Sequence, residues 1–145
     1  IFSRDRRSRN TSLSFFEMRE KAEDVLRFMG IAELKDALVV GQPYGIRKKV
    51  EMARTLMCNP KLIILDEPAA GLNDVETQQL ADNIYQVREK YGCTILLVEH
   101  DMRLVMSICD RICAISFGKF LACGTPSEIQ GNAQVQEAYL GEKEE

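Results

Sequence analysis

Two adjacent carboxylates that follow a short apolar run are the residues of this chain best suited to chemistry. Residues 62–65 (LIIL) lead directly into Asp66 and Glu67, and Pro68 follows. An apolar run between prolines predicts a buried strand of a parallel sheet, and open α/β sheets bind their ligands at the carboxyl ends of such strands. Two acids there repel each other and lose solvation, so we expect Mg²⁺ or a shared proton to offset their charge. The alternative is a strand that ends in a solvated acidic turn.

A second apolar run places another group of polar residues at a strand end. Residues 94–98 (TILLV) predict a buried strand, and Glu99 and His100 follow it. Parallel neighbours end at the same edge of a sheet, so we expect His100, the chain's single histidine, beside the two carboxylates. There its imidazole can position a water or contact a phosphate. A lone histidine is more often a bystander, and Glu99 is the weaker candidate.

A glycine-containing helix start is the third candidate site. Backbone N–H groups at a helix N-terminus bind anions, and a glycine lets a phosphate approach the backbone closely. The alternative is an ordinary helix start with three basic residues on its solvated face. The residues concerned are Pro43, Tyr44, Gly45 and Ile46, followed by Arg47, Lys48 and Lys49.

The elements that must position these groups are helices first, then alternating strands and helices. Asn73 is expected to cap the helix after the first strand, with Glu76 completing a capping box. This order predicts an α/β chain, with a helical portion at residues 1–60 and part of an α/β core at 61–145. The predicted helices are 14–29, 32–38, 45–57, 74–90, 102–109 and one or two short ones within 126–140; a hairpin is predicted at 111–116 and 119–123.

Composition excludes several classes of protein. The chain has 145 residues, 46% of them hydrophobic, and a net charge of −3, which fits a folded domain and argues against a dedicated nucleic-acid binder. No apolar run reaches the length of a membrane-spanning helix, and no signal peptide is apparent. Five cysteines without a C-x-x-C pair predict buried free thiols in a reducing compartment. The arginine-rich residues 1–10 and the charged residues 141–145 are expected to be solvated, mobile ends.

Taken together, these segments resemble the ATP-binding subunits of ABC transporters. The resemblance covers essentially the whole chain, and motifs in the same order make it specific. It implies a partial P-loop NTPase sheet with flanking helices. The matching segments are residues 42–56 for the signature motif and its helix, 62–68 for the Walker B strand, 70–73 for the D-loop, and 97–101 for the switch histidine.

Further segments resemble the ATPase of branched-chain amino acid importers, namely residues 43–45, 67–73 and 124–142. Three residues depart from the general family pattern. Pro43 replaces a serine and offers neither a hydroxyl nor an N–H, Ile46 replaces a glutamine, and Asn73 replaces an aspartate. The importer type tolerates the changes at Pro43 and Asn73, whereas Ile46 is the less usual substitution.

The largest departure is the missing P-loop. No G-x-x-x-x-G-K-[ST] sequence occurs, since the single Gly-Lys pair, Gly118-Lys119, is followed by Phe120. No Q-loop glutamine precedes the helical region either. The resemblance therefore implies the C-terminal portion of an ATPase subunit, inactive on its own. A strand edge left uncovered in such a portion favours association.

The resemblance also implies roles, cofactors and partners. Asp66 would hold Mg²⁺, Glu67 would act as general base, and His100 would contact the γ-phosphate. Residues 43–46 would close over ATP bound to a second ABC ATPase subunit, in a homo- or heterodimer, and Asn73 would link the two sites. Integral-membrane permease subunits are the other expected partners, and the expected location is cytoplasmic, on the inner face of the membrane. The alternatives are an ABC-type ATPase outside transport and an inactive scaffold.

Overall fold

The computed structural model describes residues 14–140, so the predicted mobile ends at residues 1–10 and 141–145 lie outside the described residues. The chain divides into two compact units, Ile1–Asn59 and Pro60–Glu145. Their assignment as portions of a helical subdomain and of an ATPase core remains a prediction. Within 14–140, no helix is long and apolar enough to cross a membrane.

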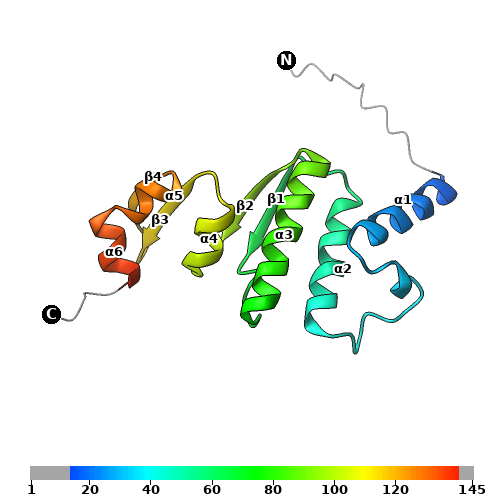
Figure 1. The fold of residues 1–145 in the computed structure, drawn as a ribbon. Helices are drawn as coiled ribbons and strands as arrows, with labels where there is room; N and C mark the ends of the chain where they lie inside the picture. Colours follow the sequence, from blue (N-terminus) through cyan, green and yellow to red (C-terminus); the bar gives the residue numbers. More distant parts are fainter. Residues whose placement is uncertain (1–13, 141–145) are drawn as a thin grey trace, which may run out of the picture. The chain divides into compact units, whose positions relative to one another are not determined.

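The described part of the first unit is helical, with α1 at Phe15–Phe28, a 3-10 turn at Ala32–Leu34 and α2 at Tyr44–Leu56 (Figure 1). Lys21 fastens α1 to the end of α2, because its Nζ donates hydrogen bonds to the Met57 carbonyl (2.8 Å) and to Asn59 Oδ1 (2.9 Å). The helix expected at 32–38 is wrong in length. Residues 35–38 are all exposed, Leu38 at 81%, so burial does not stabilise a further helical turn.

The second unit contains a two-stranded parallel sheet and an antiparallel hairpin. Its elements, in chain order, are β1 (Leu62–Asp66), α3 (Asp74–Tyr91), β2 (Thr94–Val98), α4 (Met102–Ile108), β3 (Ile112–Ser116), β4 (Lys119–Gly124), α5 (Pro126–Gln130) and α6 (Ala133–Leu140). β1 pairs with β2 in a register that sets Asp66 opposite Val98. The α/β class is therefore confirmed, and α3 is the crossover that makes the two strands parallel (Figure 1).

Local sequence explains where α3 begins and ends. Asn73 and Glu76 form the predicted capping box. Gly92 ends the helix with a φ of 59°, a conformation that favours glycine. Ala81, Ile84 and Val87 recur at helical spacing and form the buried face. The helix thus returns the chain to the start of β1, where Thr94 N donates to the Lys61 carbonyl at 2.9 Å.

One face of the parallel sheet is open, which corrects the prediction of fully buried strands. Along β1, Ile63 is 3% exposed, whereas its neighbours Leu62 and Ile64 are 52% and 62% exposed. On the same face of β2, Leu96 and Val98 are 51% and 49% exposed. We call these four residues the open sheet face. Parallel sheets are normally covered on both faces, so this face is an apolar surface suited to association.

We expect this open sheet face to drive self-association of the chain. Replacing both Ile64 and Leu96 by lysine puts two charges on it and should shift the chain towards monomer in sedimentation velocity. Val75→Lys is the matched control, because Val75 is 67% exposed at the start of α3, outside the open sheet face. Equal sedimentation of the double variant and the parent chain would contradict this expectation.

The cysteines are less buried than expected. All five are free, but of these only Cys93 is buried, while Cys58, Cys113 and Cys123 are exposed. Cys113 and Cys123 face each other across the β3–β4 hairpin. The alternation of a strand places them on its outer side, opposite the buried Ala114 and its neighbours. The exposure of these three cysteines therefore corrects the expectation that the thiols are buried.

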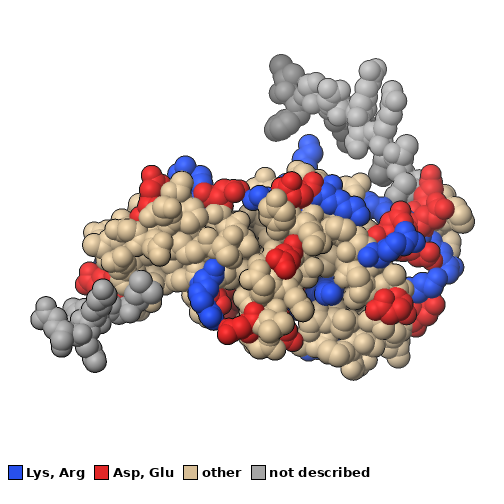
Figure 2. Space-filling model, in the orientation of Figure 1, with Lys and Arg blue, Asp and Glu red and all other residues tan. Residues whose placement is uncertain are grey.

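Charged side chains of both signs lie intermixed on the face shown in Figure 2. The surface formed there by the C-terminal elements is mainly uncharged. Beneath it lies a small core to which α4, the hairpin and the last two helices all contribute. Its buried members are Val105, Ile112, Ala114, Ile129 and Val135.

Candidate functional site

The carboxyl ends of β1 and β2 bring two of the predicted residues together. Glu67 directly follows β1, His100 lies two residues after β2, and His100 Nδ1 is 3.7 Å from Glu67 Oε1. Their side chains are 57% and 73% exposed, respectively. A carboxylate and an imidazole at this separation can both contact one small polar group or water, and either side chain can exchange a proton with it.

A tight turn aims Glu67 away from the strand. Its φ is 43°, a left-handed conformation that is unusual for a residue other than glycine. The Glu67 N–H donates to the Val98 carbonyl at 2.9 Å, and the Glu67 carbonyl accepts from Ala70 N at 3.1 Å. Pro68, which is buried, has no N–H to place. The Glu67 N–H therefore adds one hydrogen bond to the pairing of β1 with β2, and the backbone then leaves the sheet.

The side chain of Glu99 is buried next to His100, although the sequence marked it only as the weaker candidate. Its side chain is 1% exposed. One carboxylate oxygen accepts from Ala69 N at 2.8 Å and the other from His100 N at 3.1 Å. The period of the strand could have indicated this, because Glu99 continues the inward positions of Ile95 and Leu97.

Asp66 and Glu67 are both exposed, which corrects the expectation that they lose solvation. Water screens their mutual repulsion, so their proximity does not by itself demand a cation. Among residues 14–140, no group of three or more His, Cys, Asp or Glu side chains could hold a metal ion. Mg²⁺ is commonly held by one or two carboxylates, with water and phosphate oxygens completing its shell. Asp66 thus fits a Mg²⁺ that arrives with a nucleotide.

Asn73 already has a structural role. Its Oδ1 accepts from Glu76 N, and Glu76 Oε2 accepts from Asn73 N, each at 3.0 Å. Any contact to a second subunit would use its amide N–H groups or a further lone pair of Oδ1. The position of Asn73 at the start of α3 follows from this cap.

The glycine-containing helix start lies in the first unit. Pro43 is the N-cap of α2 and makes no side-chain capping bond. Tyr44 is the first helical residue, and its ring lies under Arg47 and Lys48, with 5.5 and 5.3 Å to the ring centroid. Gly45 has open space where a Cβ would stand. Ile46 is half-buried, so the first turn offers backbone N–H groups rather than polar side chains.

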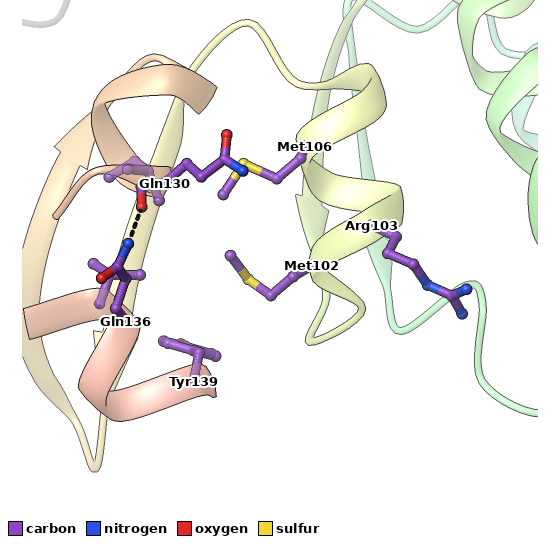
Figure 3. Close-up of a pocket in the computed structure, with 8 residues that line it drawn as sticks. Met102, Arg103, Met106, Gln130, Gln136 and Tyr139 are labelled. Carbon is purple, nitrogen blue, oxygen red and sulfur yellow. Dashed lines mark hydrogen bonds between the residues drawn. The ribbon is translucent and has the colours of Figure 1, made fainter. Parts of the chain in front are cut away.

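A separate apolar pocket of about 260 Å³ lies between α4 and the last two helices. Met102 and Met106 point into it from α4, whereas Arg103 points away (Figure 3). Gln136 Nε2 donates to the Gln130 carbonyl at 2.7 Å on the opposite wall. Tyr139 also lines the pocket and donates to the Ile115 carbonyl. None of the predicted site residues lines it.

The chain is similar in sequence and in fold to known proteins. Residues 1–70 match the family model of the ABC transporter, and residues 121–145 match that of the branched-chain amino acid ATP-binding cassette transporter. The high-affinity branched-chain amino acid transport ATP-binding protein LivG of Salmonella typhimurium is 44% identical over 87% of this chain and 49% of its own length. BraF of Pseudomonas aeruginosa, with the same description, is 44% identical over the same shares.

Another relative is named for a different role. The lipopolysaccharide export system ATP-binding protein LptB of Haemophilus influenzae is 35% identical over 88% of this chain and 52% of its own length. A crystal structure of the ADP conformation of an ATP-binding cassette of an ABC transporter superposes with a TM-score of 0.78 and 32% identity, covering 87% of this chain and 51% of the other. The chain thus spans about half the length of the curated relatives that it matches. By these matches it belongs to the ABC transporter family of ATP-binding proteins.

Proposed function

We propose that this chain is part of an ATP-hydrolysing subunit of an importer for branched-chain amino acids. The observation that carries the proposal is the pairing of Glu67 with His100, 3.7 Å apart, at the edge of a parallel sheet. The family match at residues 121–145 supports the branched-chain amino acid type over the lipopolysaccharide type. It adds to the higher identity, 44% against 35%, of the branched-chain relatives.

In this proposal Asp66, Glu67 and His100 each contribute to hydrolysis of the γ-phosphate. They lie at the carboxyl ends of β1 and β2, which we call the β1–β2 edge. Glu67 orients the attacking water and accepts its proton. His100 donates a hydrogen bond to a γ-phosphate oxygen, where negative charge must be held. Asp66 contributes a carboxylate to Mg²⁺, which when bound neutralises charge on the phosphates. The exposure of all three residues leaves them accessible to a nucleotide.

The remaining predicted residues act between subunits. Pro43 begins α2 as its N-cap, and Tyr44, Gly45 and Ile46 present the first backbone N–H groups of the helix to ATP on a second ABC ATPase subunit. Asn73, at the start of α3, contacts that subunit. The assembly works with integral-membrane permease subunits on the cytoplasmic face of the membrane, and its substrates are ATP with Mg²⁺ and the transported amino acid.

The proposal can be tested with a chimera of LivG from Escherichia coli. This relative is 43% identical over 126 residues, and the chain replaces that matching half. In cells that lack their own LivG, we expect the chimera to restore uptake of radiolabelled leucine, while the empty vector does not. The unmodified LivG serves as the positive control.

Two results would contradict the proposal. A chimera that is expressed and hydrolyses ATP, yet never supports leucine uptake, would favour an ABC ATPase with another task. The same exchange into LptB of Escherichia coli, which is 34% identical, would then test the export role. A folded chimera that does not hydrolyse ATP would favour an inactive scaffold.

A further inference from the structure

The buried carboxylate of Glu99 is the most unusual polar feature of the candidate site. A carboxylate that is withdrawn from water is costly unless hydrogen-bond donors satisfy it. Glu99 meets this condition with two backbone N–H groups, from Ala69 at 2.8 Å and from His100 at 3.1 Å. Charge-assisted bonds of this kind are roughly twice as strong as neutral ones.

The two donors belong to the two segments that carry the candidate catalytic side chains. Ala69 lies two residues after Glu67, in the turn that leads from β1 towards α3. His100 is the residue after Glu99 itself. One carboxylate therefore connects the turn that presents Glu67 to the segment that presents His100.

The backbone hydrogen bonds of the turn show why this connection matters. Glu67 N is held by the Val98 carbonyl, Pro68 has no N–H, and Ala70 N is held by the Glu67 carbonyl. Ala69 N is the remaining donor of the turn, and its acceptor is the Glu99 side chain. The residues at the end of β2 thus hold the Glu67 turn twice, once by backbone and once by side chain.

This second attachment holds a conformation that the chain would not favour alone. Glu67 has a φ of 43°, and such left-handed residues persist only where their surroundings determine them. The Glu67 and His100 side chains are themselves largely exposed, at 57% and 73%, and lie 3.7 Å apart. Their relative placement consequently depends on the backbone beneath them.

We infer that Glu99 is a positioning residue. Its carboxylate connects the turn after Glu67 to the segment that carries His100, and so maintains the relative placement of the Glu67 and His100 side chains. We call this connection the clamp. Glu99 touches neither nucleotide nor water in this role. That the clamp affects ATP hydrolysis rests on the proposed function. The clamp itself is a property of the nucleotide-free chain.

Amide hydrogen exchange in the 145-residue chain tests the clamp directly. In Glu99→Ala, NMR should show that the Ala69 and His100 amides exchange at least about tenfold faster, because each loses a charged acceptor. Glu99→Gln keeps the shape of the side chain but sets an NH₂ group against one of the two N–H donors, so at least one amide should respond. Glu137→Gln on the exposed side of α6 is the matched control, and the Thr94 amide is the internal reference.

A second measurement separates positioning from simple stabilisation. At fixed pH, Glu67→Gln should shift the His100 ring resonances in the parent chain, because the two groups lie close together. In the Glu99→Gln background the same substitution should shift them by less than half as much. A residue that only stabilised the fold would lower the melting temperature and leave this cross-effect intact.

The inference is overturned if both amides exchange within twofold of the parent in Glu99→Ala and Glu99→Gln, or if the cross-effect of Glu67→Gln is unchanged. Glu99→Gln retains the volume of the side chain, so the test remains decisive if Glu99→Ala does not fold. Neither readout requires ATP. Failure of the leucine-uptake chimera therefore leaves this test standing, and failure of the clamp leaves the proposed transport role standing.

Discussion

Replacing Glu67 by glutamine is expected to lower ATP turnover by the LivG chimera by about 10²–10⁴-fold. Glutamine has nearly the same shape, so it can still occupy the turn after β1 and approach His100, which lies 3.7 Å from the carboxylate. It cannot accept a proton from water. ATP binding should be unchanged, because Glu67 contributes no phosphate contact in the proposed mechanism. Phosphate release and binding of a fluorescent ATP analogue measure the two effects separately.

Two comparisons make this result specific to the position of Glu67. Glu137→Gln removes the same charge from the exposed surface of α6 and should leave turnover intact. His100→Gln should also reduce turnover, because it removes the imidazole beside Glu67. Phosphate release at the parent rate in Glu67→Gln would remove Glu67 from its proposed role as general base.

The local elements could largely be predicted from the sequence, because side-chain periodicity and caps determine them. β2 occupies the predicted Thr94–Val98, and β1 extends one residue beyond the predicted strand to include Asp66. Asn73 and Glu76 form the capping box that their spacing indicates. The short helix before α2 was wrong in length, since its second half is exposed, with Leu38 at 81%, and gains no stability from burial.

Burial and side-chain partners could not be predicted in the same way, because they depend on which other segments cover an element. An apolar strand predicts burial, yet Ile64 is 62% exposed on a sheet that is covered on one side. The pairing of Asp66 with Val98 follows from parallel topology, which the pattern did indicate. The left-handed backbone of Glu67 and the bonds of Glu99 come from a turn whose geometry no periodicity reports.

Titration of the 145-residue chain with Mg·ATP is expected to give no saturable heat, which corresponds to a Kd weaker than about 1 mM. Triphosphates are bound mainly by backbone N–H groups and a lysine, and no G-x-x-x-x-G-K-[ST] sequence occurs in these residues. Asp66 and Glu67 are exposed carboxylates. They repel the phosphates of ATP unless a metal ion lies between the carboxylates and the phosphates.

Isothermal calorimetry on the chain and on the chimera shows whether the affinity for ATP comes from this chain or from the half contributed by LivG. A micromolar Kd for the chain alone, abolished by Asp66→Asn, would contradict the expectation and place a nucleotide site at the β1–β2 edge itself. Binding by the chimera but not by the chain would show that the affinity comes from the half contributed by LivG. In that case the β1–β2 edge supplies the hydrolytic groups, and Glu67→Gln in the chimera should separate binding from turnover.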